Sequence, residues 1–283
     1  MRQPILCLAG ALWLTGCSAP APVEEATPAV WELTSPGGER GWMMGTIHAL
    51  PAGVDWRSDA VEEALADADV LVVEIANLGD PSTAATLADL SETPGQPPLT
   101  QRVDRGERRD LEALLADAGM ADADFSRMES WAAALTLSAA VREGDAANGV
   151  DRALLAEADE VIALETATGQ LGLFDGLSGP AQSDLLAGVA RDHRRGTGDA
   201  ARRAWMAGDA DRVAALAREG LLGNAELRRV LLTARNEDWA PRIAELVDAG
   251  REPFVAVGAG HVAGDGGLAD LLADRGYTVR RIR

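Results

Sequence analysis

The sequence predicts an α/β fold in which a central β-sheet carries a largely helical insertion. Strand-like runs alternate with helical patterns near both ends of the chain, which is typical of a sheet covered by helices. Between these ends lies a long stretch of helical patterns, and this stretch is the expected insertion. Hydrophobic residues make up 47% of the 283 residues, enough to form a sizeable core.

The first residues resemble a bacterial lipoprotein signal. A single positive charge at Arg2 precedes an apolar run that is too short to span a bilayer. The run ends in Leu14-Thr15-Gly16-Cys17, which is similar to a lipobox, where cleavage leaves a cysteine to be acylated. We therefore expect a signal peptide at 1–16, lipidation of Cys17 and a periplasm-facing location in the cell envelope, on the outer membrane. The alternative is an ordinary secretory signal with a cysteine there by chance.

A flexible tether is expected after the signal. Residues 17–28 are rich in Pro and Ala and lack an apolar period. The folded domain is expected over 29–283. Because cleavage before Cys17 removes Cys7, one cysteine would remain, and no disulfide or cysteine-based metal site can form within one chain.

The first part of the domain alternates strands with helices. Two strand-like runs at 30–34 and 41–47 flank a turn that contains Pro and Gly. Residues 59–68 follow with apolar side chains at helical spacing. The run 70–75 is continuous and β-branched, which indicates a strand covered on both faces. The polar region after it predicts only a weak helix, around 82–90.

The expected insertion has two parts, at about 105–148 and 167–250. Within the first part the run 131–141 is apolar on every side, which indicates a buried helix. Between the two parts, 161–165 forms a second apolar run, which predicts another buried strand. The remaining expected elements are a buried strand at 254–258, a short helix around 268–272 and a last strand at 278–282.

The charge balance argues against nucleic acid as a partner. The formal charge is −19, and all 26 basic residues are arginines. Such an acidic surface repels nucleic acids and anionic lipid head groups at long range. We therefore expect contact with a membrane only through the lipid anchor.

Four side chains capable of acid–base or metal chemistry lie at or just beyond the carboxyl ends of expected strands. They are His48, Glu74, Glu165 and His261, and the two histidines end matching Gly-x-x-His segments. In open α/β sheets ligands bind at this edge, because loops and helix N-termini converge there. Two imidazoles and two carboxylates could hold a divalent metal, and a glutamate that is not a ligand could act as general base on a metal-bound water. Taken singly, each residue has a plainer interpretation, as a salt-bridge partner or as a structural hydrogen-bonding residue.

Arg235 and Asn236 form a second candidate pair. They interrupt an apolar helical stripe, where a guanidinium could enter the cleft and bind a substrate carboxylate or orient a ligand. The alternative is that Arg235 lies on the solvent-exposed face of the helix and has no role in the site. His193 lies in a charged run and is expected at a solvated helix end. No serine occupies a nucleophile-elbow motif, and the mature chain lacks a nucleophilic cysteine, which argues against covalent hydrolase chemistry.

Short motifs follow one another in a particular order along the chain. They are Gly45-Thr46-Ile47-His48, Val72-Val73-Glu74, Gly149-Val150-Asp151, Leu164-Glu165-Thr166, Gln170, Arg235-Asn236 with Trp239, and Gly258-Ala259-Gly260-His261 with Gly264 and Gly267-Leu268. In this order and spacing they resemble the TraB/GumN family, whose eukaryotic relatives include the Tiki metalloproteases, and the resemblance covers about 30–283.

The resemblance implies a mixed sheet flanked by helices, similar to the erythromycin esterase and ChaN-like group. It also implies a metal site, with Mn, Co or Zn as candidate ions and the two histidines and two glutamates named above as ligands. We therefore hypothesise a lipid-anchored, periplasmic, metal-dependent hydrolase, with peptidase as the expected activity, in which Arg235 or Asn236 positions a peptide or protein substrate. The rival hypothesis is a non-catalytic lipoprotein that binds a metal, haem or another ligand in the same cleft.

Overall fold

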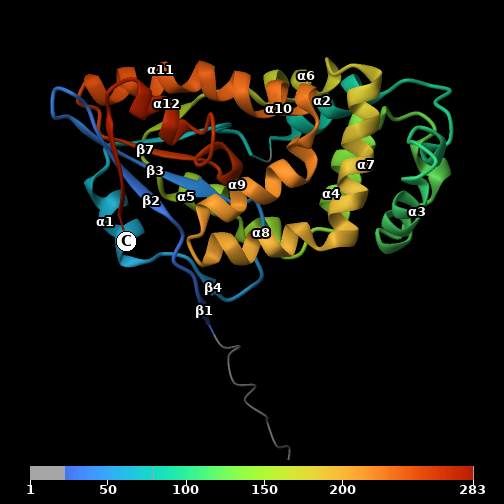
Figure 1. The fold of residues 1–283 in the computed structure, drawn as a ribbon, viewed down its shortest axis with the longest axis horizontal. Helices are drawn as coiled ribbons and strands as arrows, with labels where there is room; N and C mark the ends of the chain where they lie inside the picture. Colours follow the sequence, from blue (N-terminus) through green and yellow to red (C-terminus); the bar gives the residue numbers. More distant parts are fainter. Residues whose placement is uncertain (1–22, 79, 283) are drawn as a thin grey trace, which may run out of the picture.

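A computed structural model describes residues 23–78 and 80–282 (Figure 1). Six strands form the central sheet: β2 (Val30–Thr34), β3 (Arg40–Thr46), β5 (Val70–Val73), β6 (Val161–Ala163), β7 (Pro253–Gly258) and β8 (Thr278–Ile282). Their order is β6-β5-β7-β3-β2-β8. The first four run parallel to one another, whereas β2 pairs antiparallel with both β3 and β8. This mixed sheet, flanked by helices, confirms the predicted α/β fold.

The folded part begins before Ala29, the start that composition predicts. β1 (Glu24–Glu25) pairs in parallel with β4 (Val54–Asp55). Ala26 is buried, and its N–H donates to the carbonyl of Asp55. The end of the expected tether therefore packs on the domain, and the sequence does not reveal this because a two-residue strand has no visible period. The predicted signal peptide and Cys17 lie outside the described residues.

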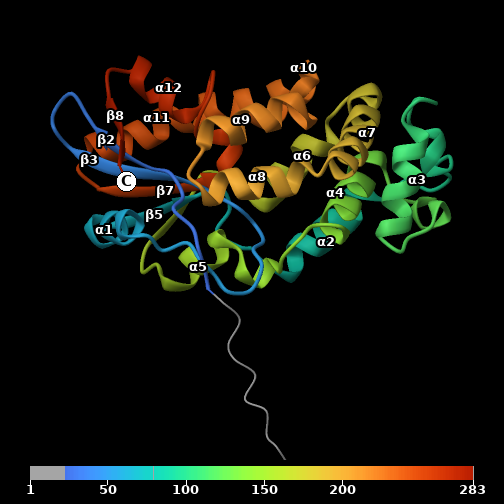
Figure 2. The same ribbon diagram turned by 60° about the horizontal axis from the view of Figure 1, so that its bottom comes forward.

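Different helices cover the two faces of the sheet (Figure 2). The helices that pack on it include α1 (Asp59–Asp67), α5 (Val150–Glu157), α11 (Ala234–Asp248) and α12 (Leu268–Asp274). Met44 and Phe254 point to the face covered by α1 and α5. Their neighbours Met43 and Val255 point to the face covered by α11 and α12. Because successive strand residues face opposite sides, burial on both sides requires the continuous apolar runs seen in the sequence.

The remaining helices extend the molecule beside the sheet. They are α2 (Pro81–Ser91), α3 (Arg108–Asp117), α4 (Ser130–Ala140), α6 (Ala167–Asp175), α7 (Gly179–Arg195), α8 (Thr197–Met206), α9 (Ala210–Glu219) and α10 (Ala225–Arg228). Short 3-10 turns lie at Leu99–Gln101, Asp122–Phe125, Ala146–Asn148, Leu221–Gly223 and Ala259–His261, and a π-helical turn, Arg229–Thr233, joins α10 to α11. Leu114, Trp131 and Leu185, from α3, α4 and α7, belong to one separate apolar core. In both views α3 lies at the end of the molecule far from the sheet.

Two elements differ from their predicted burial. α4 is buried in its first half, but residues 138–140 are exposed, because the chain leaves the helical core there and turns back to pair Asp145 with Leu50. β6 is an edge strand and only half-buried, since an apolar run does not reveal how many neighbours a strand has. No helix within the described part of the chain is long and apolar enough to cross a membrane.

Candidate functional site

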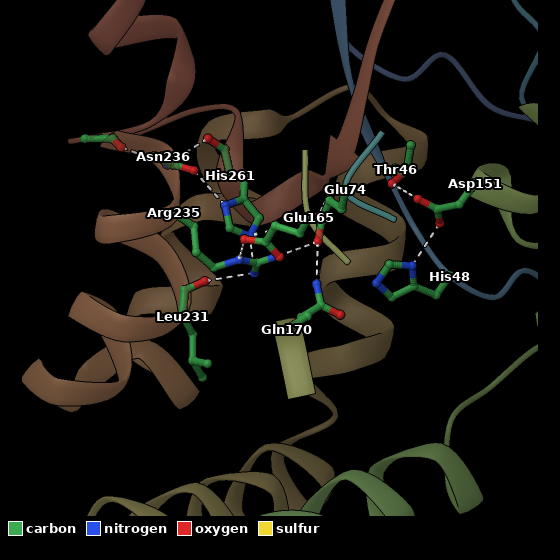
Figure 3. Close-up of polar contacts among 12 residues, drawn as sticks. Thr46, His48, Glu74, Asp151, Glu165, Gln170, Leu231, Arg235, Asn236 and His261 are labelled. Atoms are coloured by element: carbon green, nitrogen blue, oxygen red, sulfur yellow. Dashed lines mark hydrogen bonds and ion pairs between the residues drawn. The ribbon is translucent and has the colours of Figure 1, made fainter. Parts of the chain in front are cut away.

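The four parallel strands end at one edge of the sheet, and each is followed by one of the predicted site residues (Figure 3). Glu74 directly follows β5, while Glu165 and His48 follow β6 and β3 after one intervening residue. His261 ends the 3-10 turn that follows β7. The structure therefore brings all four to the predicted edge, but their side chains divide into two groups.

Three of the four surround the guanidinium of Arg235, which lies in the first turn of α11. Its Nε and Nη2 donate to the two oxygens of Glu165, both at 2.9 Å. Nη2 also donates to Oε2 of Glu74 at 2.6 Å, and Nη1 donates to Nε2 of His261 at 3.0 Å. We call these four residues the Arg235 cluster.

The Arg235 cluster is buried and ionic. The side chains of Arg235, Glu74 and Glu165 are only 10%, 13% and 15% exposed. Burial alone would lower the pKa of Arg235, but its hydrogen bonds and ion pairs with the two glutamates raise it. Buried charges persist in proteins when they are paired in this way. The guanidinium thus acts as the resident cation of the cluster.

His261 is held in one tautomer. A guanidinium only donates, so the Nε2 that accepts from Arg235 carries no proton. Nδ1 is then the protonated nitrogen, and it donates to Oδ1 of Asn236 at 2.7 Å. Burial lowers the pKa of His261 to about 4, although the negative charge of Glu74 opposes this shift. His261 is therefore neutral at pH 7.

Asn236 fixes the loop that carries this histidine. It is fully buried, and its side-chain nitrogen donates to the backbone carbonyls of His261 and Gly266, at 3.2 and 2.9 Å. Its oxygen accepts from the imidazole of His261. Since every polar atom of this side chain is bonded to the protein, Asn236 acts here as a positioning residue.

Glu74 connects the cluster to the open side of the site. Oε1 accepts the backbone N–H of Gly258 at 2.6 Å, and Oε2 accepts the side-chain N–H of Gln170 at 3.0 Å. Burial alone would raise the pKa of Glu74, but the charge that His261 gains below about pH 4, the charge of Arg235 and the N–H of Gly258 lower it to about 2. Glu74 is therefore ionised at neutral pH.

His48 belongs to a separate chain of hydrogen bonds. Its Nδ1 lies 2.8 Å from Oδ2 of Asp151, whose Oδ1 accepts the hydroxyl of Thr46 at 2.5 Å. Because a carboxylate only accepts, Nδ1 carries the proton, and Nε2 of the neutral ring keeps a free lone pair. The hydrogen bond to Asp151 raises the pKa of His48 above its ordinary value. The His48 side chain is 60% exposed, and Nε2 points away from Asp151 (Figure 3).

The first glycine of each Gly-x-x-His segment permits a close approach. A Cβ on Gly45 would lie 2.7 Å from the Cα of Ala259, so a larger residue would push β3 away from the loop after β7. A Cβ on Gly258 would lie 3.0 Å from Oε1 of Glu74. The matching segments therefore reflect the packing of two strand ends against each other and against Glu74.

A pocket of about 310 Å³ opens beside His48, and we call it the His48 pocket. Its lining residues are His48, Val73, Glu74, Ile75, Leu78, Arg142, Ala146, Asp151, Arg152 and Gln170. Glu165 instead lines a neighbouring pocket of about 230 Å³, and Ile75 contributes to the lining of both pockets. The size of the His48 pocket is at the lower end of the range for small-molecule sites, roughly 300 to 1,000 Å³.

As they are arranged, the four predicted ligands do not fit a metal ion. Nε2 of His261, Oε2 of Glu74 and both carboxylate oxygens of Glu165 already accept N–H groups of Arg235, whose positive charge also occupies the space between them. His48 bonds to Asp151 instead of joining the other three. Among residues 23–78 and 80–282, no group of three or more His, Cys, Asp and Glu is placed to hold a metal. A metal at these residues would require Arg235 to withdraw, and this part of the prediction stays a prediction.

Sequence reasoning assigned no chemical role to Asp151 or Gln170. Asp151 lies 103 residues from His48 along the chain and Gln170 lies 96 residues from Glu74, so no local spacing reveals either contact. The only indication of a role in the sequence is that both residues belong to the motifs that carry the family resemblance. Arg235 was expected at the cleft, but its contacts with two glutamates and a histidine were not.

The comparisons with known proteins support one relationship. A family model described as the TraB/PrgY/gumN family matches residues 29–281, which include both Gly-x-x-His segments, Glu74, Asp151, Glu165 and Arg235. No curated protein and no solved structure matches the chain at a significant level.

Proposed function

Because the chain belongs to the TraB/PrgY/gumN family, as its motifs predict, we propose that it is a hydrolase acting in the His48 pocket with His48 as general base. The observation that carries this proposal is the pairing of Nδ1 of His48 with Asp151, which leaves Nε2 free and exposed at the pocket. An imidazole oriented by a carboxylate is a recurring general base in hydrolases.

Water is the nucleophile in this proposal. Within the described lining of the His48 pocket there is no Ser, Thr or Cys, and its two carboxylates are engaged with other side chains. Nε2 of His48 would take a proton from a water molecule as the water attacks an electrophilic carbonyl carbon and the carbonyl oxygen becomes an oxyanion. When this intermediate collapses, the C–N bond breaks and the imidazolium returns the proton to the leaving amine nitrogen. The imidazolium formed is stabilised by Asp151, with a smaller contribution from the charge of Glu74.

Of the two predicted catalytic glutamates, the structure favours Glu74 over Glu165. Glu74 lines the His48 pocket and is ionised, whereas Glu165 lines the neighbouring pocket and has both oxygens bound by Arg235. Substrate binding by Arg235 or Asn236 is less supported, because the N–H groups of Arg235 already have protein acceptors and Asn236 is fully buried. We assign both to positioning the acids and His261.

The test is cleavage of a library of quenched fluorogenic peptides by the mature chain. We expect His48→Gln to lower kcat/KM by about 10² to 10⁴, the usual contribution of a general base. His193→Gln is the matched control, because His193 also pairs with an aspartate, Asp117 at 2.8 Å, but lies at the end of α7 outside the pocket. Unchanged cleavage by His48→Gln would remove His48 from the mechanism. If the wild type cleaves no peptide but binds a metal or haem stoichiometrically, the binding-protein hypothesis replaces the hydrolase.

Metal dependence is a separate part of the proposal. The resemblance predicts activity with Mn, Co or Zn, whereas the contacts of Arg235 favour catalysis by the side chains themselves. The same assay in EDTA, followed by addition of each metal, decides between them. Activity lost in EDTA and restored by one ion supports the metallopeptidase, and activity that persists in the chelator contradicts it.

We also propose the lipid anchor and the periplasmic location on the basis of the lipobox-like segment alone. Cys17→Ala should release the protein from membranes during cell fractionation. Continued membrane association of this variant would contradict acylation at Cys17.

A further inference from the structure

Two arginines line the His48 pocket and take no part in the proposed chemistry. Arg142 follows the end of α4, and Arg152 lies in the first turn of α5, directly after Asp151. Both are exposed, and the positive charge of Arg142 is close enough to lower the pKa of His48 against the effect of Asp151. We call them the rim arginines.

The rim arginines have no carboxylate partner within the described part of the chain. Arg152 donates to the backbone carbonyl of Leu78 at 3.0 Å, which leaves the rest of its guanidinium available. The two carboxylates of the same pocket hydrogen-bond elsewhere, Glu74 with Arg235 and Asp151 with His48. Neither forms an ion pair with a rim arginine, so both guanidiniums keep N–H donors for a ligand.

Two other pockets of similar size contain more acids than arginines. A pocket of about 360 Å³ at the opposite edge of the sheet has one arginine, Arg57, and five acids, and Arg57 pairs with two of those acids. The pocket beside Glu165 has two acids and no arginine. In a chain of formal charge −19, the His48 pocket thus differs from both in having as many arginines as acids, and neither arginine has a carboxylate partner in the described part of the chain.

We propose that the rim arginines bind a carboxylate of the substrate and so select acidic substrates for the His48 pocket. A guanidinium matches a carboxylate with two parallel hydrogen bonds, and Arg keeps its charge at any pH of interest. The small pocket suits the end of a peptide or one acidic side chain beside the bond that is cleaved. The word substrate in this inference rests on the proposed hydrolase, but binding of the carboxylate can be measured without turnover.

The experiment uses four peptides of the form Ala-Ala-X-Ala, each labelled at its N-terminus with an uncharged fluorophore. X is Glu or Gln, and the C-terminus is a free carboxylate or an amide, so the two sources of a carboxylate are separated. Fluorescence anisotropy gives Kd for each peptide, and KM replaces it for any peptide that is cleaved. The protein variants are the wild type, the double variant Arg142→Gln/Arg152→Gln, and the double variant Arg105→Gln/Arg109→Gln. The last pair is also exposed and lies outside the pocket, and it changes the net charge by the same amount.

The wild type should bind at least one carboxylate-bearing peptide roughly ten- to hundredfold more tightly than its neutral counterpart, the size expected for charge-assisted hydrogen bonds. The rim double variant should lose this preference and the control pair should keep it. Equal affinity for charged and neutral peptides, no binding of any peptide, or the same loss in both double variants would overturn the inference. If the preference is present but neither these peptides nor any member of the fluorogenic library is cleaved, the inference stands and the proposed hydrolase fails.

Discussion

The two Gly-x-x-His segments place their histidines at the same sheet edge in opposite environments. His261 is 9% exposed, and both of its ring nitrogens are bonded to protein groups. His48 is 60% exposed and has one ring nitrogen bonded and one free. Burial beside Arg235 lowers the pKa of His261, whereas the hydrogen bond to Asp151 raises that of His48.

This difference shows that a shared motif does not imply a shared role. The glycine of each segment serves packing, and the neighbours of each ring determine its chemistry. Neutral His261 accepts a hydrogen bond from Arg235 and helps to fix the two glutamates. His48 keeps the free lone pair that a general base needs.

The largest expected effect is on the buried side of this comparison. Arg235→Met leaves Glu74 and Glu165 buried without a cation, so the free energy of unfolding should fall by roughly 3 to 5 kcal/mol. Arg229→Gln is the control, because it breaks an exposed ion pair with Glu237, a type of pair that contributes about 0 to 1 kcal/mol. Urea unfolding measures both. Equal, small losses would mean that Arg235 is not the resident cation of the cluster.

A smaller effect is expected from the packing that brings the two segments together. Gly45→Ala forces its Cβ against the backbone of Ala259, and overpacking of this kind costs about 1 to 3 kcal/mol. Gly260→Ala is the control, because a Cβ there meets nothing within 4 Å. Thermal unfolding should show a clear decrease for the first variant and little change for the second. Tolerance of Gly45→Ala would contradict the close approach.

The most gradual effect expected is a dependence of stability on pH. The folded-state pKa of His261, about 4, lies below the unfolded value of 6.5, so the unfolded chain binds more protons between these values. Stability should therefore fall as the pH decreases from 6.5 to 4. Glu74, with a folded pKa of about 2 against 4.5, continues this loss as the pH falls below 4.5. Urea unfolding at several pH values should show a shallower decrease for His261→Gln between pH 6.5 and 4.5, and identical slopes would contradict the buried, neutral imidazole.

The sequence allowed the edge of the sheet to be predicted, but not the contacts made there. Continuous apolar runs ending in a polar residue placed Glu74 and His261 correctly, because such runs signal parallel strands buried on both faces. The insertion of Arg235 between the acids depends on how α11 packs on the sheet, and no local pattern encodes that. The contact of Asp151 with His48 likewise joins segments that are distant in the sequence.

The most direct test of the two-histidine account is an NMR titration of the protein with ¹⁵N-labelled histidine. There are three histidines, and the variants His48→Gln and His193→Gln assign the signals. We predict that His261 stays neutral, with its proton on Nδ1, down to about pH 4. His48 should titrate above its ordinary pKa and, when neutral, should also carry its proton on Nδ1. If the two rings titrate together, or if His261 carries its proton on Nε2, the division of roles between them is wrong.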